Sequence, residues 1–296
     1  MSAFITDAAV ARLRALDDRP DFSGTRYDLL EPIGRGGMGL VFRGRDRELD
    51  RDVAIKVTAW STAADAERLH AEARVLARLE HPGIVPVHDV GRLPDGRVFT
   101  VMMLVNGERL DARAAALPLL DRLRLFDRIC ETVAFAHARG LVHRDLKPAN
   151  IMVGAHGQVL VLDWGLARGE RDSGGAGGGT EGYMAPEQAT AAADGRSDVY
   201  ALGAILRDLA AAAGERVPRP LASIVSRATA DRPEERYDGP AALAADVRRF
   251  MDGAAVGAHR ESPLEWTARQ LRVYRTPLAL IAAYLAMRAL LLFWAR

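Results

Sequence analysis

Lysine is almost absent from this chain, although lysine and arginine together number 40. The two lysines are Lys56 and Lys147, and asparagine is equally scarce, occurring as Asn106 and Asn150. Because the composition otherwise supplies basic groups as arginine, these lysines mark positions that need a compact ammonium in place of a planar guanidinium. Lys147 and Asn150 share the segment His-Arg-Asp-Leu-Lys-Pro-Ala-Asn at 143–150, and Lys56 ends Val-Ala-Ile-Lys at 53–56. A random distribution would not place the rare residues in these two segments.

A glycine-rich segment precedes Lys56. Gly-Arg-Gly-Gly-Met-Gly-Leu-Val at 34–41 contains G-x-G-x-x-G, a pattern that is weak alone because dinucleotide-binding folds share it. No helix is predicted after it, since residues 40–43 continue as a strand and residues 52–57 read as the next strand. This context favours a flap that covers phosphates, and the sequence contains no G-x-x-x-x-G-K-[ST] loop.

Two further motifs follow, Asp-Trp-Gly at 163–165 and Ala-Pro-Glu at 185–187. With them, five motifs stand in the order typical of protein kinases. Over residues 27–251 the chain resembles that family, and its segments at 81–85 and 183–188 resemble bacterial serine/threonine kinases of the eukaryotic, or Hanks, type. The resemblance implies an α+β, bilobal protein-kinase fold with a small β-rich lobe and a larger helical lobe.

The pattern along the chain predicts four regions. These are an N-terminal extension over 1–26, a kinase domain over 27–252, a connector over 253–277 and an apolar helix over 278–294. Within the kinase domain the small lobe spans 27–104 and the large lobe 108–252. Helices are predicted at about 7–16, 62–79, 119–139, 198–212, 220–229 and 240–251.

Composition excludes some partners and compartments. The formal net charge is +1, so nothing argues for a nucleic-acid partner. The single cysteine, Cys130, stands in an apolar helical stretch and is predicted to pack in the core of a protein from a reducing compartment. Residues 1–26 lack the continuous apolar core of a secretory signal.

The resemblance assigns the phosphoryl-transfer roles. Asp145 corresponds to the catalytic aspartate that orients the substrate hydroxyl or accepts its proton, and Lys147 would reach the γ-phosphate. Lys56 would grip the α- and β-phosphates with a carboxylate partner on the following helix. Glu72 is preferred as that partner, with Glu67 as the second candidate.

ATP and Mg²⁺, or Mn²⁺, are the implied cofactors. Asn150 and Asp163 would supply oxygen ligands to the metal. The resemblance places the gatekeeper at Met102 and implies that backbone groups of Met103 and Val105 hold the adenine. The ATP-binding residues that it implies are Gly34, Arg35, Gly36, Gly37, Gly39, Val41, Ala54, Lys56, Met102, Met103, Val105 and Met152.

The substrate class follows from two features of the resemblance. The Lys-Pro wording at 147–148 is of the serine/threonine type, and Thr180 matches the threonine that lines the substrate hydroxyl's site. Protein substrates are therefore expected, with a homodimer for autophosphorylation. Ser173 is the favoured regulatory phosphosite, paired with Arg144, and the alternative is that it fills a glycine-rich linker.

Several residues are assigned structural roles. Glu187 and Arg236 resemble a buried ion pair, and Asp198 resembles the helix-start residue that braces the catalytic loop. His143 is expected to pack rather than to bind a metal. Trp164 replaces the phenylalanine usual in kinases, so a larger ring with an N–H has to be accommodated. A catalytically weak pseudokinase or scaffold stays open as the alternative function.

The C-terminal apolar run predicts a membrane anchor. Residues 278–294 give about 17 residues, or roughly 26 Å of helix, against the ~30 Å hydrocarbon core of a bilayer. Arg288 interrupts the run, and Arg260, Arg269, Arg272 and Arg275 precede it, which predicts a single-pass protein of the cell membrane with a cytoplasmic kinase domain. The alternative is a helix packed on the large lobe or on another subunit, in a soluble cytoplasmic protein.

Overall fold

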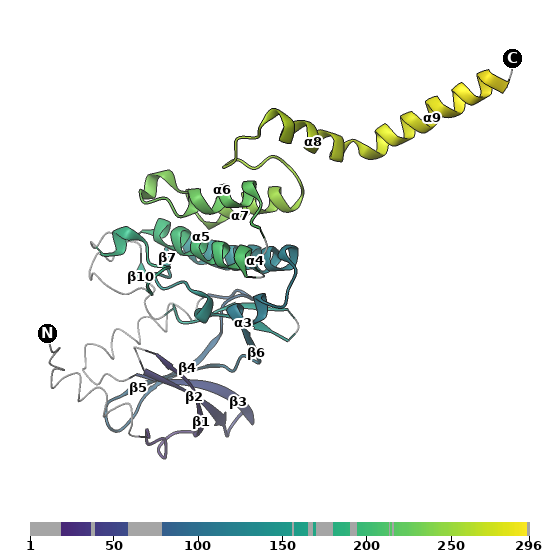
Figure 1. Ribbon diagram of the computed structural model, residues 1–296. Helices are drawn as coiled ribbons and strands as arrows, with labels where there is room; N and C mark the ends of the chain where they lie inside the picture. Colours follow the sequence, from purple (N-terminus) through teal and green to yellow (C-terminus); the bar gives the residue numbers. More distant parts are fainter. Residues whose placement is uncertain are drawn as a thin grey trace.

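The structure is a computed structural model, and it describes residues 19–36, 39–58, 79–155, 157–164, 168–169, 180–189, 194–212, 214 and 216–294. Two lobes are stacked in it, a strand-rich lobe at the bottom of Figure 1 and a helical lobe above it. Each lobe has a hydrophobic core of its own. The bilobal α+β architecture expected from the sequence is therefore confirmed.

The small lobe is built on a five-stranded antiparallel sheet in the order β1-β2-β3-β5-β4. Alternate residues of β3 (Val53, Ile55 and Val57) are buried on one face of the sheet, where β-branched side chains pack well. The opposite face of β3 carries Lys56, because successive side chains of a strand point to opposite faces. The strands are β1 (Tyr27–Gly36), β2 (Gly39–Asp46), β3 (Arg51–Thr58), β4 (Val87–Arg92) and β5 (Val98–Met103).

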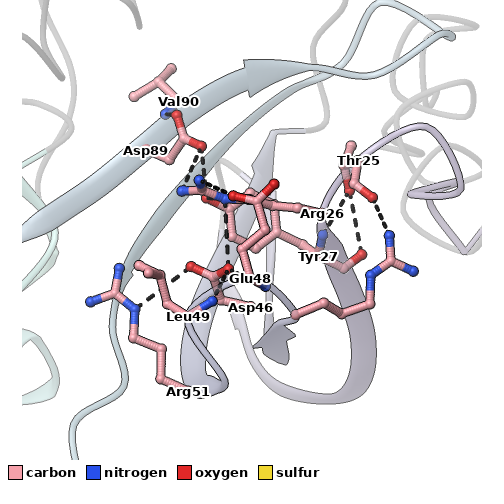
Figure 2. Close-up of polar contacts among 10 residues, drawn as sticks. Thr25, Arg26, Tyr27, Asp46, Glu48, Leu49, Arg51, Asp89 and Val90 are labelled. Atoms are coloured by element: carbon pink, nitrogen blue, oxygen red, sulfur yellow. Dashed lines mark hydrogen bonds and ion pairs between the residues drawn. The ribbon is translucent and has the colours of Figure 1, made fainter.

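Residues ahead of β1 are fastened to this lobe. Phe22 is buried, and its ring lies 4.9 Å from that of Phe99. Figure 2 shows Arg26 and Tyr27 among the carboxylates of β2, the β2–β3 turn and β4, and the Tyr27 hydroxyl donates a 2.6 Å hydrogen bond to Asp89. The Arg26 guanidinium lies within 3.0–3.6 Å of three carboxylates, Asp46, Glu48 and Asp89. Residues 19–26, the described part of the predicted extension, therefore belong to the packed lobe.

The large lobe is arranged around α4 and α5. On α4 the buried residues Leu123, Phe126, Cys130 and Val133 recur every three or four positions, with buried Ile129 next to Cys130, so one face of the helix enters the core. Cys130 packs there, as predicted. The helices are α3 (Leu110–Ala114), α4 (Leu119–His137), α5 (Gly195–Ala211), α6 (Arg219–Ala228) and α7 (Pro240–Met251), with short 3₁₀ turns at Pro148–Asn150, Pro186–Ala189 and Pro233–Glu235.

Two small sheets hold the loops of the site. One is a three-stranded sheet in the order β6-β8-β9, and the other is the pair β10-β7. The catalytic segment at 143–150 leaves β7 and enters β8, so both of its ends are fixed by strand pairing. The strands are β6 (Gly107–Arg109), β7 (Leu141–Val142), β8 (Ile151–Gly154), β9 (Val159–Val161) and β10 (Arg168–Gly169).

The segment after α7 is tied back to the large lobe. Val256 is buried in its core, and the buried carboxylate of Asp246 accepts hydrogen bonds from the backbone N–H groups of Gly257 at 2.8 Å and Ala258 at 3.0 Å. The lobe thus extends past its predicted end at 252. A capping box between Ser262 and Glu265 then starts α8 (Pro263–Val273), which is followed by α9 (Arg275–Trp294).

The predicted membrane span at 278–294 is not supported. A helix does form there, as α9, but the described part of the chain contains no helix that is long and apolar enough to cross a membrane. The alternative of packing on the large lobe is not supported either, because α8 and α9 project away from the lobes (Figure 1) and every α9 side chain that the structure describes is exposed.

Candidate active site

The catalytic segment is held by a buried carboxylate of α5. Asp198 accepts hydrogen bonds from the backbone N–H of His143 and of Arg144, each at 2.8 Å. Arg144 has φ +68°, a left-handed conformation that is costly for a residue with a side chain, and the Asp198 bond helps to hold it there. The bracing role predicted for Asp198 is confirmed, and it fixes the backbone that leads into Asp145.

Asp145, Lys147 and Thr180 form a closed triangle of hydrogen bonds. The Lys147 ammonium donates to Asp145 at 2.8 Å and to the Thr180 hydroxyl at 2.7 Å, and that hydroxyl donates to Asp145 at 3.1 Å. Asn150 donates from its side-chain amide to the Asp145 carbonyl at 2.9 Å and to its carboxylate at 3.2 Å. Four residues from the predicted site are thus brought together, with a carboxylate placed beside a hydroxyl and an ammonium.

Lys56 and Asp163 form an ion pair across the two lobes. Burial works to raise the pKa of Asp163, but the charge and hydrogen bond of Lys56 outweigh it, and that pKa stands below its ordinary value. Asp163 has φ +60°, so the segment that carries it is held in an unusual backbone conformation. Glu72 and Glu67, the predicted partners of Lys56, lie outside the described residues, as does Ser173.

The predicted nucleotide-facing side chains share one face of the small-lobe sheet. Strand register places Val41 opposite Lys56 and Ala54 opposite Met102. Directly opposed residues of an antiparallel pair lie on the same face, and so do Ala54 and Lys56, which are two positions apart. Val41, Ala54, Lys56 and Met102 therefore line a common surface next to the connection between the lobes.

The glycine-rich segment spans the end of β1 and the start of β2. Gly36 pairs with Gly39, and a Cβ on Gly39 would lie 2.0 Å from the carbonyl oxygen of Val57. Glycine is therefore needed at 39 by the close approach of β3. Gly34 and Arg35 lie on β1 and are exposed, whereas Gly37 lies outside the described residues.

The connection between the lobes carries Met103 and Val105, the residues predicted to hold the adenine. The Met103 N–H is bonded to the Pro86 carbonyl at 3.1 Å, so this donor is already used. Val105 has no backbone hydrogen bond to any described residue and is partly exposed, which leaves its N–H and carbonyl for a ligand. Met152 lies on β8, opposite Leu160 and Arg109.

A hard metal ion fits the residues at the base of the site. Asn150 uses its amide nitrogen on Asp145, which leaves its side-chain oxygen as a donor. Asp163 contributes a carboxylate that is partly exposed and ionised. No group of three histidine, cysteine or acidic side chains that could hold a metal occurs among the described residues. The donor set of one carboxylate and one amide oxygen suits Mg²⁺, which keeps several waters and binds phosphate oxygens.

Trp164 is accommodated by a hydrogen bond and by ring packing. Its indole N–H donates to the Val161 carbonyl at 3.1 Å, and its ring lies 4.6 Å from the ring of His143. Both residues are buried. His143 therefore packs, as predicted, and the indole N–H of the larger ring at 164 is hydrogen-bonded.

The segment that closes the site is anchored by a predicted ion pair and by a residue that sequence reasoning missed. Arg236 forms two hydrogen bonds with Glu187, at 2.6 and 2.8 Å, and its side chain is fully buried. Gln188 was not singled out. Its amide donates to the Arg144 carbonyl at 2.9 Å and accepts from the Ala185 N–H at 2.9 Å, which joins the Ala-Pro-Glu segment to the catalytic segment. Its position directly after Glu187 of the Ala-Pro-Glu motif was the signal in the sequence that could have identified it.

Comparison with known proteins decides the family. The model of the protein kinase domain matches residues 27–217. The chain belongs to this family. It is 36% identical over 281 aligned residues to the serine/threonine-protein kinase PknB of Mycolicibacterium smegmatis, an alignment that covers 81% of this chain and 45% of that protein.

Two further relatives come from Mycobacterium tuberculosis. The serine/threonine-protein kinase PknB is 35% identical over 276 residues, covering 79% of this chain and 44% of the relative. The serine/threonine-protein kinase PknA is 42% identical over 195 residues, covering 61% of this chain and 45% of the relative. The chain thus spans less than half the length of these relatives, and the match supports a bacterial kinase of the Hanks type.

Proposed function

We propose that this chain is an active serine/threonine protein kinase that transfers the γ-phosphate of ATP to hydroxyl groups of proteins. The observation that carries the proposal is the triangle of Asp145, Lys147 and Thr180. It supports the proposal because a carboxylate that could orient a substrate hydroxyl lies beside an ammonium that could compensate the charge of the transferred phosphoryl group. The names of the relatives support the same activity.

Each residue of the site has a separate task in this proposal. Lys56 would hold the α- and β-phosphates, Asp145 would orient the acceptor hydroxyl, and Lys147 would compensate charge at the γ-phosphate. Asn150 and Asp163 would hold Mg²⁺, which when bound neutralises the phosphate oxygens. Lys56 pairs directly with Asp163 in the structure, so the approach of a nucleotide would require Lys56 to exchange this carboxylate for phosphate.

The acceptor class follows from the environment of Thr180. Its hydroxyl occupies the position between Asp145 and Lys147, and the buried Glu187–Arg236 pair fixes the segment that begins beside it. A fixed segment at this place supplies a platform for an extended protein substrate. A pseudokinase would be expected to lack one of Lys56, Asp145 or Asp163, and all three are present.

Phosphate transfer to a generic protein tests the proposal. Purified chain is incubated with γ-labelled ATP, Mg²⁺ and a basic protein, and the labelled protein is hydrolysed to identify its phosphoamino acids. Phosphoserine and phosphothreonine are expected. The proposal would be contradicted if no phosphate were transferred with Mg²⁺ and none with Mn²⁺. It would also be contradicted if phosphotyrosine were the only product.

Regulation by phosphorylation at Ser173 is part of the proposal and rests on the sequence. Ser173 is the hydroxyl residue between 165 and 185 that stands outside the substrate-site wording, and Arg144 is the predicted partner of its phosphate. Autophosphorylation between two copies would supply the modification. Mass spectrometry of active protein tests it: a phosphate on Ser173 is expected, and full activity with unmodified Ser173 rejects the idea.

A further inference from the structure

The segment after α7 connects the large lobe to the two terminal helices. Because α8 and α9 project away from the lobes (Figure 1), the placement of α8 depends on the contacts at its start. Val256 and the N–H groups bonded to Asp246 fix the first part of this segment on the lobe. His259 follows directly, and its side chain reaches both the lobe and α8.

The ring of His259 lies between α6 and α8. Its Nδ1 is 3.0 Å from the hydroxyl oxygen of Ser223 on α6, and its Nε2 is 3.4 Å from Oε2 of Glu265 in the first turn of α8. The His259 side chain is 13% exposed, and its Nε2 is buried without a hydrogen bond to any described residue. Leaving a buried polar atom unpaired costs free energy, and a proton on this nitrogen would give it a partner in the carboxylate.

The hydroxyl of Ser223 decides which ring nitrogen carries the proton of the neutral imidazole. Its single hydrogen is donated to the Arg219 carbonyl at 3.1 Å, so its oxygen accepts from His259 and Nδ1 is the donor. In the neutral ring Nε2 is then an acceptor that faces an oxygen of Glu265, and two acceptors do not attract each other. A second proton, on Nε2, turns the same contact into an ion pair with a donor on one side.

The carboxylate of Glu265 is available for such a pair. Its pKa is held below the ordinary value, first by the backbone N–H of Ser262 and also by His259, so it stays ionised in mild acid. The neighbouring carboxylates are engaged elsewhere, Glu261 with Arg269 at 2.7 and 2.9 Å and Asp246 with Arg249 at 3.0 Å. The charged groups on the elements around the ring are Arg219 on α6, Asp246 and Arg249 on α7, Arg260 and Glu261 after α7, and Glu265 and Arg269 on α8.

We propose that protonation of His259 fastens the start of α8 to the large lobe, through an imidazolium that donates to Ser223 on α6 and to Glu265 on α8. Histidine is the side chain that ordinarily changes its charge between about pH 5 and 8. The fastened arrangement holds the proton more tightly than the released one, so it is favoured as the pH falls through this range and weakens as the pH rises. The device sets how α8 and α9 are placed relative to the lobe, and it does not rest on the proposed kinase function.

Amide hydrogen exchange of the full chain at several pH values tests the inference. The reporters are the Glu265 and Trp266 amides, which lie in the first turn of α8 and are bonded to Ser262. After correction for the intrinsic effect of pH, their protection relative to amides of α5 should be greater at about pH 5 than at about pH 8. A difference of about two- to fivefold is expected of a partly exposed ion pair.

Matched variants separate the ion pair from the helix itself. Glu265→Gln removes the charge, but glutamine also completes a capping box at this position, so α8 is retained and its dependence on pH should disappear. His259→Gln cannot gain a proton in this range and should abolish the dependence as well. His88→Gln removes a partly buried histidine of β4, in the small lobe, and should leave the dependence at α8 as in the wild type.

Nitrogen-15 chemical shifts of the His259 ring report its protons directly. The neutral ring should carry its proton on Nδ1, both nitrogens should be protonated in acid, and the midpoint of this titration should move to lower pH in Glu265→Gln. A neutral ring protonated on Nε2, or an unchanged midpoint in Glu265→Gln, would overturn the inference. Equal protection of the Glu265 and Trp266 amides of the wild type at about pH 5 and pH 8 would overturn it too.

Discussion

The Thr180 hydroxyl donates a 3.1 Å hydrogen bond to the carboxylate of Asp145, across 35 residues of sequence. The bond links the segment that closes the site to the segment that carries the catalytic carboxylate. Because Lys147 donates to both partners, the three side chains hold one another in place before any substrate arrives. Such preorganisation is the main contribution that a protein makes to phosphoryl transfer.

Removing the Thr180 hydroxyl should therefore impair turnover more than folding. Thr180→Val keeps the branched shape but loses the hydrogen bonds that the hydroxyl makes with Lys147 and Asp145, and kcat for a peptide should fall by about ten- to a hundredfold. Thr180→Ser keeps the hydroxyl and serves as the control. Steady-state kinetics with a serine peptide give the comparison, and equal kcat values for the valine and serine variants would contradict the role.

The Glu187–Arg236 pair should be a determinant of stability. Arg236 is fully buried, and replacing it with methionine leaves the carboxylate of Glu187 without its charged partner. Breaking such a pair costs about 3–5 kcal/mol of the free energy of unfolding. Urea denaturation followed by circular dichroism measures this loss.

A matched arginine provides the control for that experiment. Arg232, four positions before Arg236, pairs with Glu234, but both side chains of this pair are largely exposed. Arg232→Met should change the free energy of unfolding by less than about 1 kcal/mol. A similar loss in both variants would show that the burial of Arg236 is not what matters.

How much of this could be read from the sequence depends on the range of the contacts. The strands around Lys56 and the helix α4 follow from local periodicity, and the wording of the 143–150 segment identified Asp145, Lys147 and Asn150. The start of α5 was placed at 198, whereas the helix begins at Gly195 with Asp194 as its cap. The cap bond to the Arg196 N–H is a local signal that was overlooked.

The remaining differences come from long-range geometry. Neither the Gln188–Arg144 contact nor the His137–Asp198 contact has a pattern along the chain, because 44 and 61 residues separate the partners. The direct Lys56–Asp163 pair also depends on how the lobes are placed. The membrane span expected from the C-terminal apolar run is not supported among the described residues.

The segment after α7 gives a prediction about pH. Burial works to raise the pKa of Asp246, but the N–H of Gly257, the hydroxyl of Tyr237 and the N–H of Ala258 outweigh it, so the pKa lies below its ordinary value. A depressed folded-state pKa adds stability above the unfolded value of about 3.9, and this contribution is lost as the pH falls through the folded-state pKa.

Asp246→Asn should therefore cost stability at neutral pH and cost less in acid. A loss of about 1.5–3 kcal/mol at pH 7 is expected from the hydrogen bonds to the charged group. The difference between variant and wild type should shrink once the pH is below about 4. Urea denaturation at several pH values measures it, with Asp50→Asn as an exposed control. A difference that is independent of pH would contradict the assigned ionisation.

The catalytic role of Asp145 is the central claim, and a single-turnover comparison of wild type and Asp145→Asn tests it most directly. The two proteins are first shown to have the same ATP affinity and melting temperature. Each is then saturated with ATP and Mg²⁺, and transfer to one serine peptide is followed. The wild type should transfer phosphate, and the variant should be slower by about 10²- to 10⁴-fold, because asparagine cannot accept a proton. Transfer by Asp145→Asn at the wild-type rate would contradict the account.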